Sequence, residues 1–363
     1  MIDQTLLLIM FATGLLAINA GIMGCFVLLQ RKSLFGDTIA HATLPGIAGI
    51  FLILHSKLTW ILMMGGMISA SIGAITIHYI IKQSTLKKDT ALGIVLATSF
   101  GFGTALLSKI QTYPTAHQAG ITKYLLGNAS TILYSDLYMI AAVSIINLIC
   151  LKLFFKEYCI LLFNPDYAHT IGIPVQKISM LITLKTMLTI VVGLQTVGVI
   201  LISALLIAPA AAARQWTQQF STMIFLSACF AILSTTTGTL ISSFVNHLPT
   251  GPTIVVIATL ITFLSILFSP QGVVTSWITK KHHMKKIHAS KMLSHFMLFN
   301  ESKTDPYHAH DIKALQAIGK QSTKATLRYL EKEGLIEQSH QKNFFRLTPK
   351  GFSSASHQHK ELS

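Results

Sequence analysis

Two side chains that can bind a metal ion lie inside an apolar part of the sequence. Asp37 and His41 belong to the segment RKSLFGDTIAHATLPG, residues 31–46. Their spacing of four residues puts both side chains on one face of a helix, about one turn apart. A carboxylate and an imidazole together suit a divalent transition metal ion. Because an unused ionisable group inside a membrane is costly, we predict that the pair forms a metal pathway or gate.

A structural role for the same two residues is the alternative. Asp37 follows Gly36 and can cap the start of a helix, and His41 can be a hydrogen-bonded histidine of the core. The topology predicted below places Asp37 near the cytoplasmic end of its helix, which suits a cap as well as a gate.

The rest of the chain has the composition of a polytopic membrane protein. Of its 363 residues, 52% are hydrophobic and only 11% are charged, and the mean hydropathy is +0.59. An ordinary soluble domain does not have this composition. The four cysteines show no CxxC spacing, so the sequence indicates neither a zinc knuckle nor a disulfide framework.

Apolar stretches of about 20 residues predict an all-α architecture with eight or nine transmembrane helices. The number is open because the second stretch is short and contains Pro45, and because 179–213 can be one kinked helix plus a re-entrant segment. The predicted spans are 5–30, 39–55, 59–81, 91–109, 136–155, 179–194, 196–213, 221–243 and 252–269.

Basic residues predict the orientation of these spans. If nine spans are counted, the Lys and Arg clusters of the loops fall on one side, and cytoplasmic loops carry an excess of these residues. The sequence therefore predicts an external N-terminus and a cytoplasmic C-terminus.

The loop 155–178 is neither a span nor a simple connection. Its sequence NPDYAHTIG, residues 164–172, predicts a short helix that begins at Asn164 or Asp166 and ends near Gly172. We predict that this cytoplasmic helix receives force from another subunit. The sequence contains no GxxxxGK[ST] phosphate-binding loop, so the energy for a movement driven by ATP must come from a different subunit.

The C-terminal part is a basic, polar tail. From residue 280 onward the sequence has 15 of the 28 Lys and Arg residues and 9 of the 15 histidines. We divide the chain into a transmembrane domain, 1–275, a basic linker, 276–289, and a small cytoplasmic α+β domain, 290–363. In the last of these, three helices are predicted at 291–299, 311–318 and 323–333, and two strands of a hairpin at 335–338 and 344–348.

Three helices and a hairpin are typical of a winged helix, whose third helix enters the major groove of DNA. The residues predicted to face DNA are Thr323, Lys324, Thr326 and Arg328. Two alternatives stay open: a winged helix can bind protein, and a basic tail next to a membrane can bind membrane lipid.

Several motifs that occur together in one protein family follow one another along residues 5–272. They are GxxG at 21–24, RKSLFGDTIAHATLPG at 31–46, DTALG at 89–93, NPDYAHTIG at 164–172, VGVILISALLIAPAAA at 197–212 and LPTGPTI at 248–254. With these motifs the chain resembles the permease subunits of ABC importers for zinc, manganese or iron.

This resemblance implies a multi-pass permease of the bacterial plasma (inner) membrane that is not itself an enzyme. It implies three partners: a second permease subunit, identical or related; an ATP-binding subunit that contacts the loop at Asn164, Pro165, Asp166 and Gly172; and an extracytoplasmic metal-binding protein. The metal ion, manganese, iron or zinc, is the transported substrate, and no tightly bound cofactor is implied. Asn164 stands where the family usually has an acid.

The tail carries a second resemblance. Residues 322–351 resemble the DNA-binding part of winged-helix regulators, including iron- and manganese-dependent repressors. The alternative function is therefore a membrane-tethered, metal-responsive regulator whose tail binds DNA.

Overall fold

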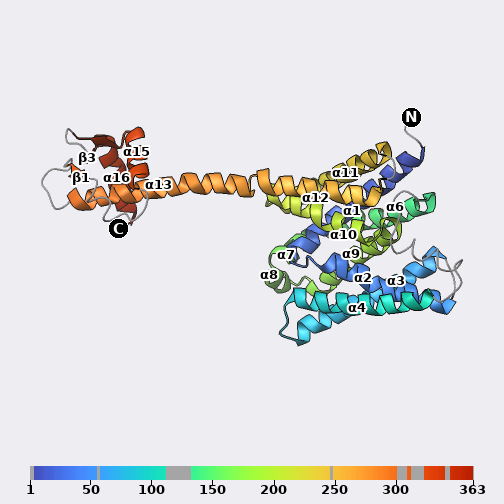
Figure 1. The fold of residues 1–363 in the computed structure, drawn as a ribbon. Coiled ribbons are helices and arrows are strands. Elements are labelled where there is room, and N and C mark those ends of the chain that lie inside the picture. Colours follow the sequence, from blue (N-terminus) through green and yellow to red (C-terminus); the bar gives the residue numbers. More distant parts are fainter. Residues whose placement is uncertain are drawn as a thin grey trace. The chain divides into compact units, whose positions relative to one another are not determined.

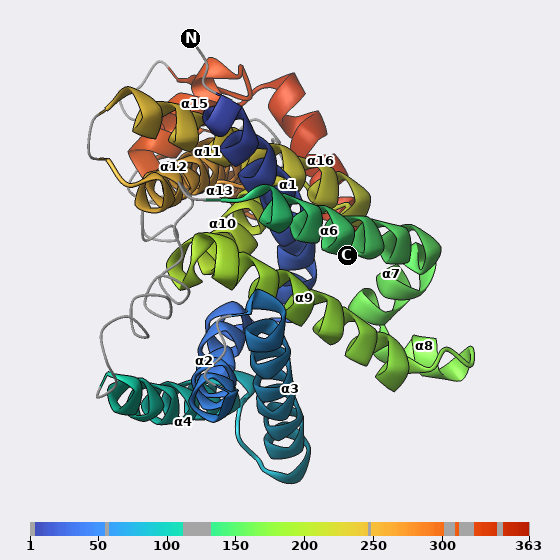
Figure 2. The same ribbon diagram turned by 90° about the vertical axis from the view of Figure 1, so that its right-hand side faces the viewer.

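The structure is a computed structural model that describes residues 4–54, 58–111, 132–245, 248–300, 309–311, 323–339 and 344–362. The chain divides into two compact units, Met1–Gly272 and Val273–Ser363. Figure 1 and Figure 2 show their helices and strands in two views.

All regular secondary structure in the described residues of the first unit is helical. Among the residues that the structure describes, nine helical segments are long and apolar enough to cross a membrane, and the ninth begins at Thr250. This number agrees with the higher of the two predicted numbers. The helices are α1 (Gln4–Leu29), α2 (Phe35–Leu54), α3 (Thr59–Gln83), α4 (Lys88–Ile110), α6 (Tyr134–Leu153), α7 (Phe155–Phe163), α8 (Pro165–Thr170), α9 (Val175–Val197), α10 (Val199–Trp216), α11 (Phe220–Phe244) and α12 (Thr250–Phe268).

Both uncertain parts of the span prediction form regular helices. Pro45 lies inside α2, which continues without a break over 20 residues. The region 179–213 is two helices, because Gly198 has a φ of 90° that ends α9 before α10 begins. A residue with a side chain rarely adopts this conformation, so the glycine sets the boundary.

Two groups of helices make up the first unit. In one, α2 packs against α3 and α4, and in the other, α1, α10, α11 and α12 pack together (Figure 2). Helix α9 contacts members of both groups. The α2–α3 contact is close enough that a Cβ atom at Gly46 would lie 2.0 Å from the carbonyl oxygen of Gly65. Small residues therefore permit this packing, as expected where lipid supplies no hydrophobic force between helices.

The second unit combines helices with a small sheet. Its elements are α13 (Val273–Asn300), β1 (His310–Asp311), α15 (Thr323–Lys332), β2 (Ile336–Gln338), β3 (Phe344–Leu347) and α16 (Pro349–Leu362). The strand order is β1-β3-β2, with both pairs antiparallel. Its core consists of the buried residues Ala289, Met292, Leu293, Phe296, Leu327, Leu330, Ile336, Leu347 and Ala355.

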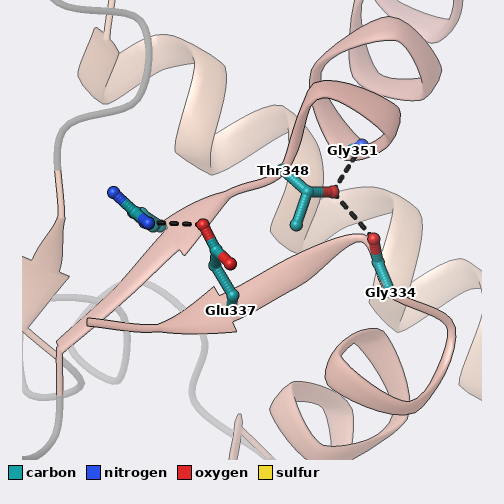
Figure 3. A network of polar contacts seen from close by, with 5 residues as sticks. Gly334, Glu337, Thr348 and Gly351 are labelled. Carbon is teal, nitrogen blue, oxygen red and sulfur yellow. Dashed lines mark hydrogen bonds and ion pairs between the residues drawn. The ribbon is translucent and has the colours of Figure 1, made fainter. Parts of the chain in front are cut away.

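Thr348 holds the end of the hairpin to the last helix (Figure 3). Its Oγ1 donates a hydrogen bond to the carbonyl oxygen of Gly334 at 2.7 Å and accepts one from the backbone N–H of Gly351 at 3.1 Å. Thr348 therefore caps α16, whose first residue is Pro349. Arg346 and Glu337 form an ion pair of 2.6 Å between β3 and β2.

The tail agrees with the sequence predictions in part. The third predicted helix and both strands of the hairpin are present as α15, β2 and β3. The predicted helix 311–318 is wrong at its first residue, because Asp311 pairs with Phe344 in the sheet, and 312–318 lie outside the described residues. Helix α13 contains both the predicted helix 291–299 and residues 276–289, which were interpreted as a linker. The sequence did not predict α16.

Candidate metal pathway and coupling loop

Asp37 and His41 lie in the first two turns of α2. The connection from α1 is tight: Arg31 has a φ of 55°, and the N–H of Phe35 donates to the carbonyl oxygen of Lys32 at 2.9 Å. Asp37 is the acidic residue of the first turn, where a carboxylate interacts favourably with the helix dipole. The structural role considered for Asp37 is therefore compatible with its position.

A stripe of four residues along α2 is only partly covered by the rest of the chain. Asp37, His41, Pro45 and Gly49, each four residues apart, are half-buried. The neighbouring positions, including Ile39, Ala40, Ala42, Thr43 and Ala48, are buried against the other helices. The two predicted metal ligands therefore lie together on the face of α2 that remains available to an ion or another subunit. We call these four residues the α2 stripe.

The imidazole of His41 has a nitrogen without a hydrogen-bond partner among the described residues. Its ring packs edge-on against Phe100 of α4, with ring centroids 5.1 Å apart. Its Nδ1 is buried and has no hydrogen-bond partner among the described residues. A histidine of the core would be expected to have such a partner. This favours a ligand role over the structural alternative.

Within the residues that the structure describes, no group of three or more His, Cys, Asp and Glu side chains could hold a metal ion. A metal ion bound by Asp37 and His41 would therefore need further ligands.

Basic residues gather beside the start of α2. Burial, and secondarily the charge of Lys88, lower the pKa of Lys32. The ammonium of Lys32 also lies 5.7 Å from the ring centroid of Phe35. Lys32, between α1 and α2, and Lys88, the first residue of α4, therefore lie at the same end of the helices, as the grouping of basic clusters predicted.

The coupling loop contains the predicted short helix, α8. Asn164 is its N-cap: its side-chain oxygen accepts a hydrogen bond from the N–H of Tyr167 at 2.9 Å, and Pro165 follows as the first helical residue. The helix therefore starts at Asn164 and not at Asp166. Gly172, with a φ of 81°, lies just after its end.

Most of α8 is accessible. Asn164, Pro165 and Asp166 are exposed, as is Gly172, and within α8 only Ala168 is buried. The described part of the chain thus leaves the four predicted coupling residues free to contact another subunit.

Helix α7 connects this loop to a buried lysine that the sequence analysis did not single out. Lys185 of α9 is 3% exposed, and its ammonium lies 5.0 Å from the ring centroid of Tyr158 on α7. Burial raises the pKa of Tyr158 to about 12, with smaller contributions from Cys150 and Glu157. A cation over an aromatic face is stabilising in a desolvated site. This contact ties α7, and with it α8, to a membrane-spanning helix.

A buried polar network joins three spans and was also missed. Asn147 of α6 donates hydrogen bonds to Asn19 of α1 at 3.1 Å and to Thr189 of α9 at 3.0 Å. Asn19 donates to the same Thr189 oxygen at 3.2 Å. All three side chains are at most 2% exposed. An asparagine in each of two apolar stretches was the only signal in the sequence.

The residues predicted to face DNA do not share one environment. Thr326 is 7% exposed, and the next residue of α15, Leu327, belongs to the core of the tail. Arg328 is exposed. The side chains of Thr323 and Lys324 are not among those that the structure describes. The contacts of these four residues with DNA stay a prediction.

Nine candidate membrane-spanning helices among the described residues, with the exposed loop helix α8 between two of them, are typical of a membrane permease. The sequence pattern of the ABC 3 transport family matches residues 2–269, and the chain belongs to this family.

Known proteins with similar sequences and structures support this assignment. The zinc transport system membrane protein TroC of Treponema pallidum is 40% identical over 269 residues, which are 74% of this chain and 90% of TroC. The manganese transport system membrane protein MntC of Bacillus subtilis is 36% identical over 263 residues, 72% of this chain and 60% of MntC. The structure resembles a chain of PsaBC from Streptococcus pneumoniae in complex with Fab, with a TM-score of 0.66 and 29% identity. That match covers 77% of this chain and 96% of the other.

Proposed function

We propose that this chain is the membrane permease subunit of an ABC importer that carries a divalent transition metal ion past Asp37 and His41. The observation that carries the proposal is the position of this pair on the half-buried α2 stripe, with His41 Nδ1 unpartnered among the described residues. A carboxylate and an imidazole accept manganese, zinc and iron. The names of TroC and MntC favour zinc or manganese as the substrate.

A second permease subunit would complete the ligand set. A zinc ion takes about four ligands, and Asp37 and His41 of one chain provide two. Two copies related by a twofold axis present the same surface to each other. If the α2 stripe lies at this axis, the two pairs together provide four ligands, and movement of the subunits would open and close the site during alternating access.

The ATP-binding subunit would contact α8. The helix is exposed, it is fixed at both ends by Asn164 and Gly172, and α7 links it to the spans through Tyr158 and Lys185. Such a helix can transmit a movement of the ATPase to α9. In this arrangement α8 and the C-terminus are cytoplasmic, and an extracytoplasmic binding protein delivers the metal ion on the other side.

Uptake of radioactive manganese, zinc and iron tests the proposal. Cells that carry this permease with its ATPase and binding protein should accumulate one of these ions, and ATP depletion should stop the uptake. Co-purification of the ATPase, lost when Asp166 and its neighbours are replaced, tests the coupling loop. Uptake that continues without an ATP-binding subunit would contradict the proposal in favour of a secondary transporter or channel.

A membrane-tethered regulator is the second candidate function. In this part of the chain the helix α15 is followed by the β2–β3 hairpin, and a winged helix has the same order of elements. The side chain of Arg328 on α15 is exposed, which also favours this function. Its test is salt-dependent binding of duplex DNA by the full chain. Because Thr326 is buried, replacing Arg328 is the informative change: binding that is unaffected in Arg328→Gln would contradict DNA contact through α15.

A further inference from the structure

The first half of α13 is a helix with few contacts. Its described side chains between residues 273 and 288 are exposed or half-buried, whereas the second half packs into the tail core through Ala289, Leu293 and Phe296. A helix of this length is marginal in water without a surface to pack against. Residues 273–288 therefore need a surface to pack against.

The charge of α13 is of one sign. Residues 273–300 contain five lysines and four histidines, and no Asp or Glu. The lysines have no acidic neighbour on their own helix with which to form ion pairs. Their charge is therefore available to an anionic partner.

Apolar side chains share a face with some of these lysines. Trp277 and Met284 are seven residues apart and lie on one face of the helix, with Ile287 at its edge. They are 63%, 50% and 47% exposed. Lys281 lies on the same face, and its ammonium is 4.9 Å from the ring centroid of Trp277.

The opposite side of the helix is polar. Thr275, Thr279, His283 and Lys286 occupy it. An apolar face with a central Trp and flanking lysines, opposite a polar face, is typical of a helix that lies in a membrane interface. DNA offers anionic groups but no apolar layer for Trp277, Met284 and Ile287.

A membrane surface is within reach of this helix. The membrane-spanning helix α12 ends at Phe268, and α13 begins at Val273. The intervening residues can span at most about 15 Å. The start of α13 therefore cannot leave the neighbourhood of the lipid headgroups.

We propose that residues 273–288 bind anionic phospholipid headgroups in the membrane interface. Trp277, Met284 and Ile287 enter the boundary between headgroups and acyl chains, and Lys280, Lys281 and Lys285 contact the phosphates.

Fluorescence of Trp277 tests this proposal on the full chain. The other tryptophans, Trp60 and Trp216, are replaced by Phe, so that Trp277 is the sole reporter. The protein is placed in nanodiscs of phosphatidylcholine, with or without phosphatidylglycerol. We expect Trp277 to be protected from aqueous acrylamide and quenched by brominated lipid only in the discs with phosphatidylglycerol, and to lose both effects in about 1 M salt, where the Debye length is about 3 Å.

Two double variants with equal loss of charge provide a matched comparison. Lys280→Gln/Lys281→Gln removes lysines of the Trp277 face and should weaken the headgroup interaction on the order of tenfold. Lys286→Gln/Lys332→Gln removes lysines elsewhere and should leave the quenching unchanged. Hydrogen exchange of residues 273–288 in the wild-type chain gives a second measurement that does not depend on the tryptophan replacements.

Three results would overturn the proposal. Equal acrylamide quenching in both kinds of disc would show that the helix does not bind anionic lipid. Protection that persists in pure phosphatidylcholine and in high salt would show apolar insertion without headgroup recognition. Protection by added duplex DNA, but not by phosphatidylglycerol, would assign the surface to nucleic acid.

Discussion

Two groups of polar side chains lie within the membrane-spanning helices, and their surroundings differ. Asn19, Asn147 and Thr189 are almost completely buried and hydrogen-bond to one another across α1, α6 and α9. Asp37 and His41 are half-buried on one face of α2, and His41 Nδ1 has no partner among the described residues. The first group joins three spans by hydrogen bonds within the chain, although Asn147 Oδ1 has no partner among the described residues. The second is left open, which is what a site for an ion or a second subunit requires.

Replacing the open pair should have the largest effect on transport and little effect on stability. Loss of a residue that only supports a metal ligand lowers metal affinity or activity roughly 10- to 100-fold. We expect Asp37→Ala and His41→Ala each to lower metal uptake by more than this. Because both residues are half-buried, the free energy of unfolding should change by only about 0.5 kcal/mol. Radioactive uptake and thermal unfolding of the purified protein measure the two effects.

His78→Gln is the control for this prediction, because His78 is an exposed histidine of the span α3. It should transport normally. Normal uptake by both alanine variants would end the assignment of Asp37 and His41 to the metal pathway.

Replacing a residue of the buried network should lower stability and leave transport unchanged. Thr189→Val keeps the shape of the side chain and removes the oxygen that accepts from Asn19 and Asn147. We expect it to destabilise the protein by about 1–2 kcal/mol, because two buried donors lose a partner. Uptake per folded molecule should stay unchanged.

Thr186→Val provides a matched comparison on the same helix. Thr186 is equally buried, but among the described residues its hydroxyl bonds only to the carbonyl oxygen of Ile182, one turn earlier. Its replacement should change stability by no more than about 0.5 kcal/mol. If the two valine variants unfold alike, the network does not contribute to stability.

The N-cap residue of α8, Asn164, differs from both groups because its hydrogen bond is to a backbone N–H three residues away. Asn164→Ala removes the bond to Tyr167 and should weaken the short helix by about 1 kcal/mol. We expect less ATPase to co-purify and uptake to fall severalfold. Asn164→Asp keeps the cap and should retain both. If the aspartate variant fails like the alanine variant, the amide itself contacts the partner.

The smallest expected effect concerns Lys32, beside the open pair. Its lowered pKa means that the folded protein binds this proton less tightly than the unfolded chain. Stability should therefore rise with pH between the lowered pKa and the ordinary value of 10.5. Lys88→Gln removes a repulsive charge, so it should reduce this rise and stabilise the protein at neutral pH by a few tenths of a kcal/mol. Chemical unfolding at several pH values measures both; an unchanged pH profile would exclude the interaction.

The parts of the structure that follow from local patterns were predictable. Long apolar stretches and the motif order indicated the spans and the family, and the turn residues around Asn164 and Gly172 indicated α8. The same reasoning failed at Asp311, where pairing with Phe344 places the residue in a sheet. The burial of Thr326 was not predicted either, because the face of α15 that turns inward depends on the elements that pack against this helix.

The sequence by itself therefore determined the class of protein, the number of spans to within one, and which residues could bind a metal ion, because hydropathy and ligand chemistry are properties of the residues and their spacing. Only the tertiary structure decided which polar groups are satisfied. Whether a side chain meets a partner, as Asn147 meets Thr189, or stays open, as His41 does, depends on which helices pack together. That packing joins residues far apart in the chain, through contacts that no local pattern specifies.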